Sequence, residues 1–374
     1  MENINNNQVV NLTKEDFVSD QIVKWCPGCG DHAILKAVED VFPKLGKRKE
    51  DIVVVSGIGC SSRFPYYMNT YGFHSIHGRA AAIATGVKLA NPNLSVWVIT
   101  GDGDCTAIGG NHFIHAVRRN IDMNLLLFNN RIYGLTKGQF SPCTFRGTVT
   151  KTSPQGTYED PFNVGELVIG AGGKFFARGV DVNTQELTQI CCEAKNHDGL
   201  SVVEILQNCM IFSNGIHSNI TAKEVRDDMQ VKCVHGKPLI FGKDRNKGIV
   251  LRGNRLEVVT IGENGVTEAD ILVHDEKEKT TGIHMMLAHM MPPEYPVAIG
   301  VIRSVEAPTY NQCLDGVIEE ETAKSKIHCV DDHSTAEALG ILNKTTDYGQ
   351  RSTNFVHKIK RGSRSFIKFR EPLY

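Results

Sequence analysis

A carboxylate and a carboxamide are spaced along this chain in a way that suits a metal–diphosphate site. The GDGD turn at residues 101–104 follows the apolar run 95–100, and Asn130 comes after the apolar run 124–128. The interval from Asp102 to Asn130 is long enough for one strand–helix–strand unit. The two side chains would then meet at the carboxyl ends of neighbouring parallel strands, where open α/β sheets bind ligands. Oxygen ligands of this kind suit Mg²⁺, whose coordination phosphate oxygens complete. The pattern therefore predicts a diphosphate site with bound Mg²⁺.

Four of the eleven cysteines stand in contexts that suit metal ligation. Cys26 and Cys29 belong to a CPGC turn, in which proline and glycine fold the backbone so that two thiolates converge. Cys60 and Cys209 each follow a strand-like apolar run, so we expect them at the same rim of the sheet as Asp102. This set fits the four-cysteine ligation of a [4Fe–4S] cluster. Structural zinc and a redox-active CxxC pair fit the spacing about equally well.

The elements that must position these residues alternate between helix and strand from about residue 20 to 225, as a layered α/β sheet requires. Helices are predicted over residues 31–42, 77–90 and 105–119. The third helix follows the GDG turn, so its first amide groups can face a phosphate, where the helix dipole also favours an anion. The start of this helix is therefore a second, independent reason to expect the diphosphate at the GDG turn.

Three regions are expected along the chain. Residues 1–20 are polar and form a flexible extension, residues 21–225 form the diphosphate-binding α/β domain, and residues 226–374 form a C-terminal region. That last region holds strand-like runs and a methionine-bearing helix over residues 284–291. The basic tail, residues 351–374, has seven lysines and arginines and one acidic residue. A solvated tail is the simpler interpretation, and docking on an acidic partner surface is the alternative.

The bulk properties predict a soluble cytoplasmic protein. The chain has 374 residues and a formal net charge of −1, so no global field draws it to nucleic acid or to a membrane surface. No stretch approaches ~20 consecutive apolar residues, and the amino terminus lacks the apolar core of a signal peptide. Cytosolic thiols normally stay reduced. We expect the remaining cysteines to be buried as small core residues: Cys105, Cys143, Cys191, Cys192, Cys233, Cys313 and Cys329.

Residues 101–130 resemble the thiamine diphosphate signature, in which GDG is followed at about this interval by NN. The longer stretch 101–142 is similar to the β subunits of 2-oxoacid:ferredoxin oxidoreductases, and the similarity extends from the CPGC turn to about residue 303. The resemblance implies a thiamine diphosphate-binding α/β fold, with a mainly parallel sheet flanked by helices and a C-terminal extension. It also implies three cofactors: thiamine diphosphate, Mg²⁺ and a [4Fe–4S] cluster.

The resemblance assigns roles to individual residues. Mg²⁺ would be held by Asp102, Asn130 and the backbone carbonyl of Ile132, and the cluster by Cys26, Cys29, Cys60 and Cys209. The residues expected to bind the thiamine cofactor are Gly101, Asp102, Gly103, Asp104, Asn130, Ile132, Gly134, Leu135 and His77.

The candidate catalytic residues are His77 and Arg63. By the resemblance, His77 would lie near the diphosphate, and Arg63 could pair bidentately with a substrate carboxylate. A structural histidine and a surface salt bridge are the alternatives for these two residues. Cys143 stands in SPC, where the family pattern would have SPT.

The implied activity is the oxidative decarboxylation of a 2-oxoacid with coenzyme A, with electrons passing through the cluster to ferredoxin. The implied partner is an α subunit, because only the diphosphate-binding half of a thiamine site is recognisable in this chain. We expect 2-oxoglutarate as the substrate and succinyl-CoA as the product. Pyruvate or branched-chain 2-oxoacids are the alternative substrates, and a non-catalytic iron–sulfur electron-transfer subunit is the alternative class.

Overall fold

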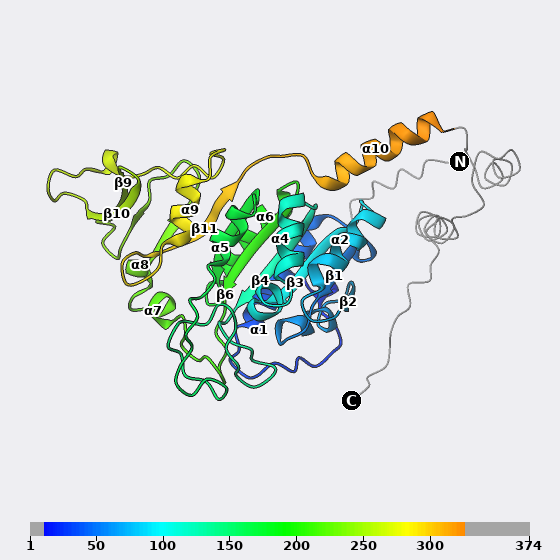
Figure 1. Ribbon diagram of the computed structural model, residues 1–374, viewed down its shortest axis with the longest axis horizontal. Helices are drawn as coiled ribbons and strands as arrows, with labels where there is room; N and C mark the ends of the chain where they lie inside the picture. The colour runs from blue at the N-terminus through cyan, green and yellow to red at the C-terminus, as the bar shows by residue number, and fades with distance from the viewer. Residues whose placement is uncertain (1–10, 326–374) are drawn as a thin grey trace, which may run out of the picture.

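The computed structural model describes residues 11–325, and its centre is an eight-stranded sheet with the strand order β2-β1-β3-β4-β6-β5-β11-β7 (Figure 1). The pairs from β2 to β5 are parallel, β11 is antiparallel to β5, and β7 is parallel to β11. The mainly parallel sheet that the sequence predicts is confirmed. Its strands are β1 (Ile52–Ser56), β2 (Tyr71–His74), β3 (Ser95–Gly101), β4 (Met123–Asn129), β5 (Phe175–Val180), β6 (Leu200–Leu206), β7 (Gln230–Cys233) and β11 (Val297–Ser304).

Helices pack on both faces of this sheet because its central strands are apolar on both sides. Strands β1 and β6 are buried along their whole length, as expected for parallel strands covered on both faces. One face packs against α2, α4, α5 and α9, and the other packs against α1 and α6. The α-helices are α1 (Asp31–Val41), α2 (Ala80–Ala90), α3 (Asp102–Thr106), α4 (Gly110–Arg119), α5 (Val164–Gly170), α6 (Thr184–Asn196), α7 (Ser218–Thr221), α8 (Arg226–Met229), α9 (Gly282–His289) and α10 (Tyr310–Lys324).

Shorter elements complete the described part of the chain. An antiparallel three-stranded sheet has the order β10-β9-β8. This small sheet and α10 lie at opposite ends of the long axis (Figure 1). Its strands are β8 (Ile240–Phe241), β9 (Lys247–Arg252) and β10 (Arg255–Thr260), and the 3₁₀ helices are η1 (Glu15–Phe17), η2 (Phe42–Leu45), η3 (Lys49–Asp51), η4 (Ser61–Tyr66) and η5 (Glu268–Asp270).

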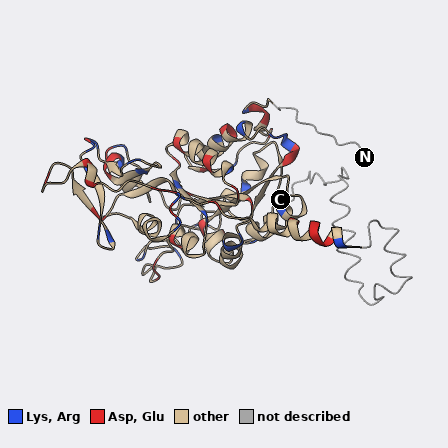
Figure 2. Cartoon of the chain, turned by 90° about the horizontal axis from the view of Figure 1, so that it is seen from above, with Lys and Arg blue, Asp and Glu red and all other residues tan. Residues whose placement is uncertain are grey.

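Strands from two of the expected regions contribute to the main sheet. Strands β7 and β11 belong to the main sheet, so this sheet draws on both sides of the boundary at residue 225. The division into residues 21–225 and 226–374 stays a prediction. Basic and acidic side chains are interspersed over the described residues, with acids gathered near the end of α10 (Figure 2). None of the helices within residues 11–325 has the length and apolar character needed to cross a membrane.

Two local predictions are wrong. The helix predicted over 105–119 is divided into α3 and α4; between them Ala107 leaves helical geometry, with φ −84° and ψ −109°. Cys313 is exposed on α10, and Cys192 is half-buried because its side chain only partly packs against the core. Burial is confirmed for Cys105, Cys143, Cys191 and Cys233. Residues 1–10, Cys329 and the basic tail lie outside the described residues.

Candidate active site

The sheet brings the predicted carboxylate and carboxamide to one edge. Strands β3 and β4 are neighbours, with Gly101 opposite Phe128, so Asp102 and Asn130 follow at the same end of the two strands. Asp102 is 2% exposed, and its Oδ2 accepts a hydrogen bond of 2.5 Å from the Ser141 hydroxyl. The Asn130 side-chain oxygen accepts a bond of 3.1 Å from the backbone N–H of Ile132. Both side chains are therefore held in fixed orientations.

The electrostatics of this corner suit a divalent cation. Burial raises the pKa of Asp102 to about 6, while the Ser141 hydroxyl, the Gly103 backbone N–H and the buried Arg131 guanidinium oppose the rise. A carboxylate that is costly to ionise in an apolar environment gains from a cation placed against it. The donors at this corner are a carboxylate and an amide oxygen, which are hard ligands that Mg²⁺ prefers. The residues present therefore fit Mg²⁺.

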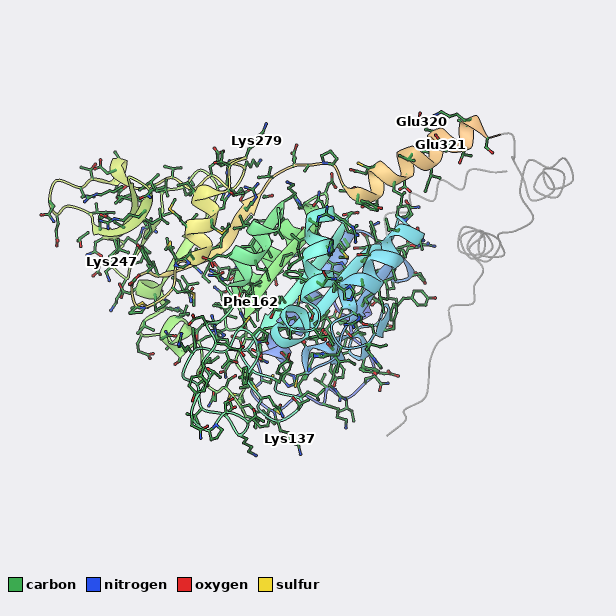
Figure 3. All side chains as sticks on the ribbon, viewed as in Figure 1. Lys137, Phe162, Lys247, Lys279, Glu320 and Glu321 are labelled. Atoms are coloured by element: carbon green, nitrogen blue, oxygen red, sulfur yellow. The ribbon has the colours of Figure 1, made fainter. Side chains whose placement is uncertain are left out.

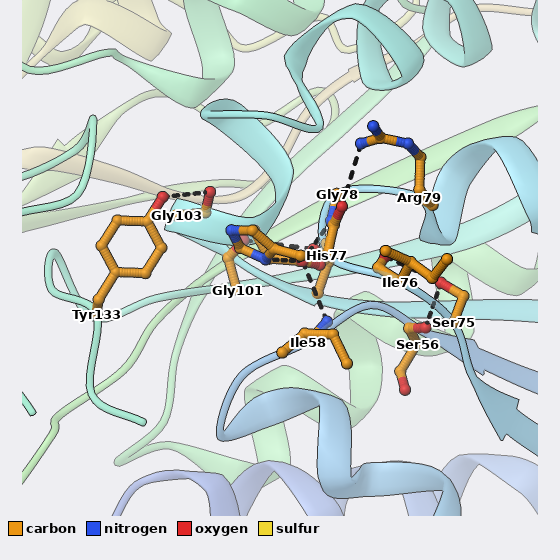
Figure 4. A network of polar contacts seen from close by, with 12 residues as sticks. Ser56, Ile58, Ser75, Ile76, His77, Gly78, Arg79, Gly101, Gly103 and Tyr133 are labelled. Carbon is orange, nitrogen blue, oxygen red and sulfur yellow. Dashed lines mark hydrogen bonds and ion pairs between the residues drawn. The ribbon is translucent and has the colours of Figure 1, made fainter. Parts of the chain in front are cut away.

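Asp104 organises the same corner through protein donors, of which His77, Gly78 and Ile58 are labelled in Figure 4. Its Oδ1 accepts from the Gly78 backbone N–H at 2.7 Å, from the Ile58 backbone N–H at 3.1 Å and from His77 Nδ1 at 2.7 Å. Its Oδ2 accepts from the Thr100 hydroxyl at 2.7 Å. Both oxygens are thus occupied by the chain itself. Any contribution of Asp104 to cofactor binding would act through the groups that it holds.

His77 is fixed on one side and open on the other. Because the carboxylate of Asp104 accepts, Nδ1 of His77 carries the proton of that bond and Nε2 is left free to exchange one. The His77 side chain is 38% exposed, and its ring centroid lies 6.0 Å from that of Tyr133. This arrangement places an imidazole nitrogen at the rim of the corner, where it could reach a bound molecule.

The loop after Asn130 connects the Asp102 corner to the cysteines. The Tyr133 hydroxyl donates a hydrogen bond of 2.9 Å to the Gly103 carbonyl. The next residue, Gly134, faces two thiols: a Cβ added there would lie 3.5 Å from Cys60 Sγ and 3.6 Å from Cys209 Sγ. Gly134 therefore lies against the cysteines, and the two candidate sites share one loop.

The four candidate thiols form one group. Cys26 and Cys29 are joined by a turn in which the Cys29 N–H donates to the Cys26 carbonyl at 3.1 Å. Burial raises the pKa of Cys60 to about 12, with Asp31, Cys209 and Cys26 adding to the rise. Burial likewise raises the pKa of Cys29, with contributions from Asp31, Cys209 and Cys60. Each of the four thiols thus lies within electrostatic range of at least one other.

The type and number of these donors suit the four-cysteine ligation of an iron–sulfur cluster. Thiols ionise when they ligate a metal, and burial, which raises the pKa of Cys29 and Cys60, makes a compensating positive charge necessary there. A single Zn²⁺ requires all its sulfur ligands within about 2.3 Å of one point. Within residues 11–325, no group of three or more His, Cys, Asp or Glu side chains is arranged to hold one metal ion.

Residues around the cysteines complete the second candidate site. Asp31 is 1% exposed, and its carboxylate has no hydrogen-bond partner among the described residues. Burial raises the pKa of Asp31 to about 7, the Cys29 thiol opposes the rise, and Asp181 adds to it. The Trp25 indole donates to the Cys60 carbonyl at 2.7 Å.

Arg63 lies on the cysteine side of the molecule. Its Nε donates to the Tyr67 hydroxyl at 3.0 Å, and its charge opposes the rise in the pKa of Cys60. The side chain is half-buried. Its assignment to a substrate carboxylate stays a prediction. Leu135, next to Gly134, is 48% exposed, and the loop bearing it reaches the molecular edge where Lys137 is labelled (Figure 3).

The segment after β6 ties the two candidate sites together. The Ser213 hydroxyl donates to the Asn130 carbonyl at 2.8 Å, and the Ser213 N–H donates to the Cys209 carbonyl at 3.2 Å. The Gln207 N–H at 3.0 Å and His217 Nε2 at 2.9 Å both contact the Asn129 carbonyl. The loop that carries Cys209 is therefore bonded directly to the asparagine pair that follows β4.

A buried ion pair, Arg178 and Glu204, is hydrogen-bonded to the first residue of the asparagine pair, Asn129. Arg178 Nε donates to Glu204 Oε2 at 2.7 Å, and the Asn129 side-chain amide donates to Glu204 Oε1 at 2.7 Å. All three residues are at most 2% exposed. Arg131, at φ 58°, donates to the Cys143 carbonyl at 2.6 Å. These bonds hold the backbone on both sides of Asn130.

Sequence reasoning missed several of these residues. Ser141, Tyr133 and Thr100 orient the Asp102 and Asp104 corner, and Gln207 contacts a candidate ligand. The residue types carry no distinctive spacing, and Ser141 lies in the long loop between β4 and α5, which has no helix or strand. The SPC motif was the one available signal, since its first residue is Ser141.

Comparison with known proteins decides the family. A family model described as the thiamine pyrophosphate enzyme, C-terminal TPP binding domain, matches residues 57–205. The 2-oxoglutarate oxidoreductase subunit KorB of Mycobacterium tuberculosis is 48% identical over 298 residues, which are 79% of this chain and 79% of that protein. The chain belongs to the β subunits of the 2-oxoacid:ferredoxin oxidoreductases. The predicted family and the predicted thiamine diphosphate-binding domain are confirmed.

Further relatives agree with this family. Subunit β of 2-oxoacid:ferredoxin oxidoreductase 2 from Aeropyrum pernix is 45% identical over 53% of this chain and 64% of that protein. Among solved structures, the 2-oxoglutarate:ferredoxin oxidoreductase from Magnetococcus marinus, with 2-oxoglutarate, coenzyme A and succinyl-CoA bound, superposes with a TM-score of 0.70. That match has 30% sequence identity and covers 89% of this chain and 98% of that one. This β subunit is therefore part of an oxidoreductase, with the fold of that family.

Proposed function

We propose that this β subunit carries the thiamine diphosphate, Mg²⁺ and [4Fe–4S] cluster of an enzyme that oxidises 2-oxoglutarate to succinyl-CoA. The observation that carries the proposal is the contact between the two candidate sites. Gly134 lies against two of the thiols, and Ser213 bonds the Cys209 loop to Asn130. An electron donor bound at the Asp102 corner would therefore sit beside an electron acceptor bound at the cysteines.

In this proposal, different residues of the corner bind the cofactor and transfer the proton. Asp102, Asn130 and the Ile132 carbonyl would hold Mg²⁺ and, through it, the diphosphate; Gly101 and Gly103 would let the backbone approach. Bound thiamine diphosphate would supply the carbon nucleophile and electron sink that decarboxylation of a 2-oxoacid needs. His77, with Nδ1 fixed by Asp104, would exchange a proton through Nε2 at the exposed rim.

The four cysteines would receive the electrons from the corner. Cys26 is exposed, whereas Cys209 is buried and Cys29 and Cys60 are half-buried, so the group spans from the interior to the surface. Such a path suits one-electron transfer to an external carrier, for which ferredoxin is the family's expected partner. The relatives named for 2-oxoglutarate support that substrate over pyruvate or branched-chain 2-oxoacids.

An α subunit would complete the enzyme. The chain offers one half of a thiamine site, the diphosphate half, and β subunits of this family imply a second subunit. We propose a cytoplasmic heterodimer unit, in which the α subunit supplies the pyrimidine-binding half and the residues that select the 2-oxoacid. The exposed His77 edge is where such a partner would meet the cofactor.

The test is co-purification with the native partner under argon, followed by coenzyme A-dependent viologen reduction with a panel of 2-oxoacids. We expect the highest activity with 2-oxoglutarate. A preference for another 2-oxoacid would contradict the proposed substrate. An inactive complex that binds no thiamine diphosphate would contradict the proposed enzymatic activity. The second candidate, an electron-transfer subunit without thiamine, predicts a brown protein that dithionite bleaches and that lacks thiamine binding.

A further inference from the structure

A buried glutamine contacts one of the candidate cluster ligands. Gln207 follows β6 directly and is 1% exposed. Its side-chain nitrogen, Nε2, lies 3.2 Å from Cys29 Sγ and 2.7 Å from the Asn208 carbonyl oxygen. Both partners are acceptors when the cysteine is a thiolate, so the nitrogen rather than the oxygen of the amide must face them. Chemistry thus fixes the orientation of this amide.

We propose that Gln207 is a positioning residue that tunes the reduction potential of the cluster, through an N–H···S hydrogen bond to Cys29. This inference rests on the proposed function, because it requires a cluster at the four cysteines. Hydrogen bonds to the sulfur ligands are one of the factors that set the potential of an iron–sulfur centre. A donor stabilises the more negative, reduced state, so Gln207 raises the potential.

The packing around Gln207 holds this donor in place. The Gln207 backbone N–H donates to the Asn129 carbonyl at 3.0 Å, and a Cβ added at Gly30 would lie 3.0 Å from Gln207 Cγ. The aliphatic part of the side chain therefore packs closely against Gly30, and the backbone of Gln207 is fixed by its bond to Asn129. Because the residue is almost fully buried, water does not compete for the amide proton.

The other end of the amide strengthens the inference. Gln207 Oε1 is buried and has no hydrogen-bond partner among the described residues. Leaving an acceptor unsatisfied costs free energy, so the polar contribution of this side chain comes from its nitrogen alone. That nitrogen donates hydrogen bonds to the Asn208 carbonyl and to Cys29 Sγ. A purely structural tie would need only the Asn208 bond.

The placement of Gln207 also connects the two halves of the site. Through its backbone it bonds to Asn129, next to the candidate Mg²⁺ ligand Asn130, and through its side chain it reaches Cys29. In the proposed function, Gln207 is thus bonded both to the asparagine pair of the electron-releasing site and to a ligand of the electron-receiving cluster. A change of potential at the cysteines would therefore alter the driving force of that transfer.

The experiment is a redox titration, monitored by EPR, of the αβ complex carrying Gln207→Met. Methionine keeps the length of the side chain but has no N–H donor. We expect the equilibrium constant for one-electron reduction to fall about tenfold, since hydrogen bonds to charged groups are the stronger class; a tenfold change corresponds to about 59 mV. Gln230→Met is the matched control, because Gln230 is buried and donates to the Ile220 carbonyl at 2.9 Å without touching a cysteine.

The outcomes separate the inference from the function on which it rests. A normal cluster with an unchanged potential in Gln207→Met would overturn the role of Gln207 and leave the function intact. A wild-type complex without a reducible cluster would contradict the proposed function itself. If the variant fails to assemble, pulsed EPR on wild type labelled with amide-¹⁵N glutamine decides: a ¹⁵N coupling to the reduced cluster supports the inference, and no coupling overturns it.

Discussion

Replacing Ser141 by alanine tests the electrostatics of the Asp102 corner. The Ser141 hydroxyl donates to Asp102 Oδ2 over 2.5 Å, where the carboxylate is 2% exposed. Burial raises the pKa of Asp102 to about 6, and the Ser141 bond is the largest influence that opposes the rise. A hydrogen bond to a charged group contributes about 1.5–3 kcal/mol, so its loss should raise the pKa by a further 1–2, approximately.

The consequence is a pH-dependent loss of cofactor affinity, because the metal binds the ionised carboxylate. Protonation of Asp102 lowers the apparent affinity by a factor equal to one plus the ratio of protonated to ionised Asp102. At pH 6 that factor is about 2 for the wild type and about 10–100 for Ser141→Ala. We therefore expect the variant to bind about 5–50-fold more weakly at pH 6, and at most about twofold more weakly at pH 8.

The assay is isothermal titration calorimetry of thiamine diphosphate with Mg²⁺ from pH 6 to pH 8, on complexes purified under argon. The ratio of variant to wild-type affinity removes the titration of the cofactor itself. Ser201→Ala is the matched control, because the buried Ser201 hydroxyl donates to the Ala194 carbonyl at 2.7 Å, away from the corner. The same loss at every pH, or no loss, would refute the reasoning about Asp102.

Three further predictions concern the cysteines, the buried ion pair and the imidazole. Cys209→Ser should remove iron and acid-labile sulfide from the protein, whereas Cys191→Ser, in the buried face of α6, should leave both unchanged. Arg178→Met should lower the free energy of unfolding in urea by about 3–5 kcal/mol, because it leaves Glu204 buried without its cation; an unchanged unfolding midpoint would contradict this. Burial raises the pKa of Glu204 but Arg178 outweighs it, so the net pKa is lowered. The stability that this pair contributes should therefore be present above the ordinary glutamate pKa and lost as the pH falls through the lowered value. His77→Gln should lower kcat while leaving the calorimetric affinity for thiamine diphosphate nearly unchanged, and a loss confined to affinity would instead assign His77 to binding.

The strands that lead into the site could be predicted from the sequence. The apolar runs before Gly101 and before Asn130 end at turn residues, and the structure places β3 and β4 there. Their pairing follows because a short strand–helix–strand unit leaves neighbouring parallel strands. The juxtaposition of Asp102 and Asn130 depends only on the local sequence and on one crossover connection. It could therefore be predicted from the sequence.

The rest depends on contacts between distant segments. Apart from the SPC motif that begins at Ser141, no local pattern near Ser141 or Gln207 indicates that they face Asp102 and Cys29, because loop conformations are set by tertiary packing. The joining of β11 to β5, in the antiparallel sense, brings together segments more than a hundred residues apart. Cys313 was misjudged for the same reason: whether a helix face is covered depends on what packs against it, not on its own residues.

The central claim is that Asp102 anchors Mg²⁺ and, through it, thiamine diphosphate. It is tested most directly by calorimetry of the wild-type complex and of Asp102→Ala, with circular dichroism to show that the variant is folded. The account predicts Mg²⁺-dependent binding to the wild type and none to the folded variant. Binding of equal affinity to Asp102→Ala, or no binding to the wild-type complex, would contradict it.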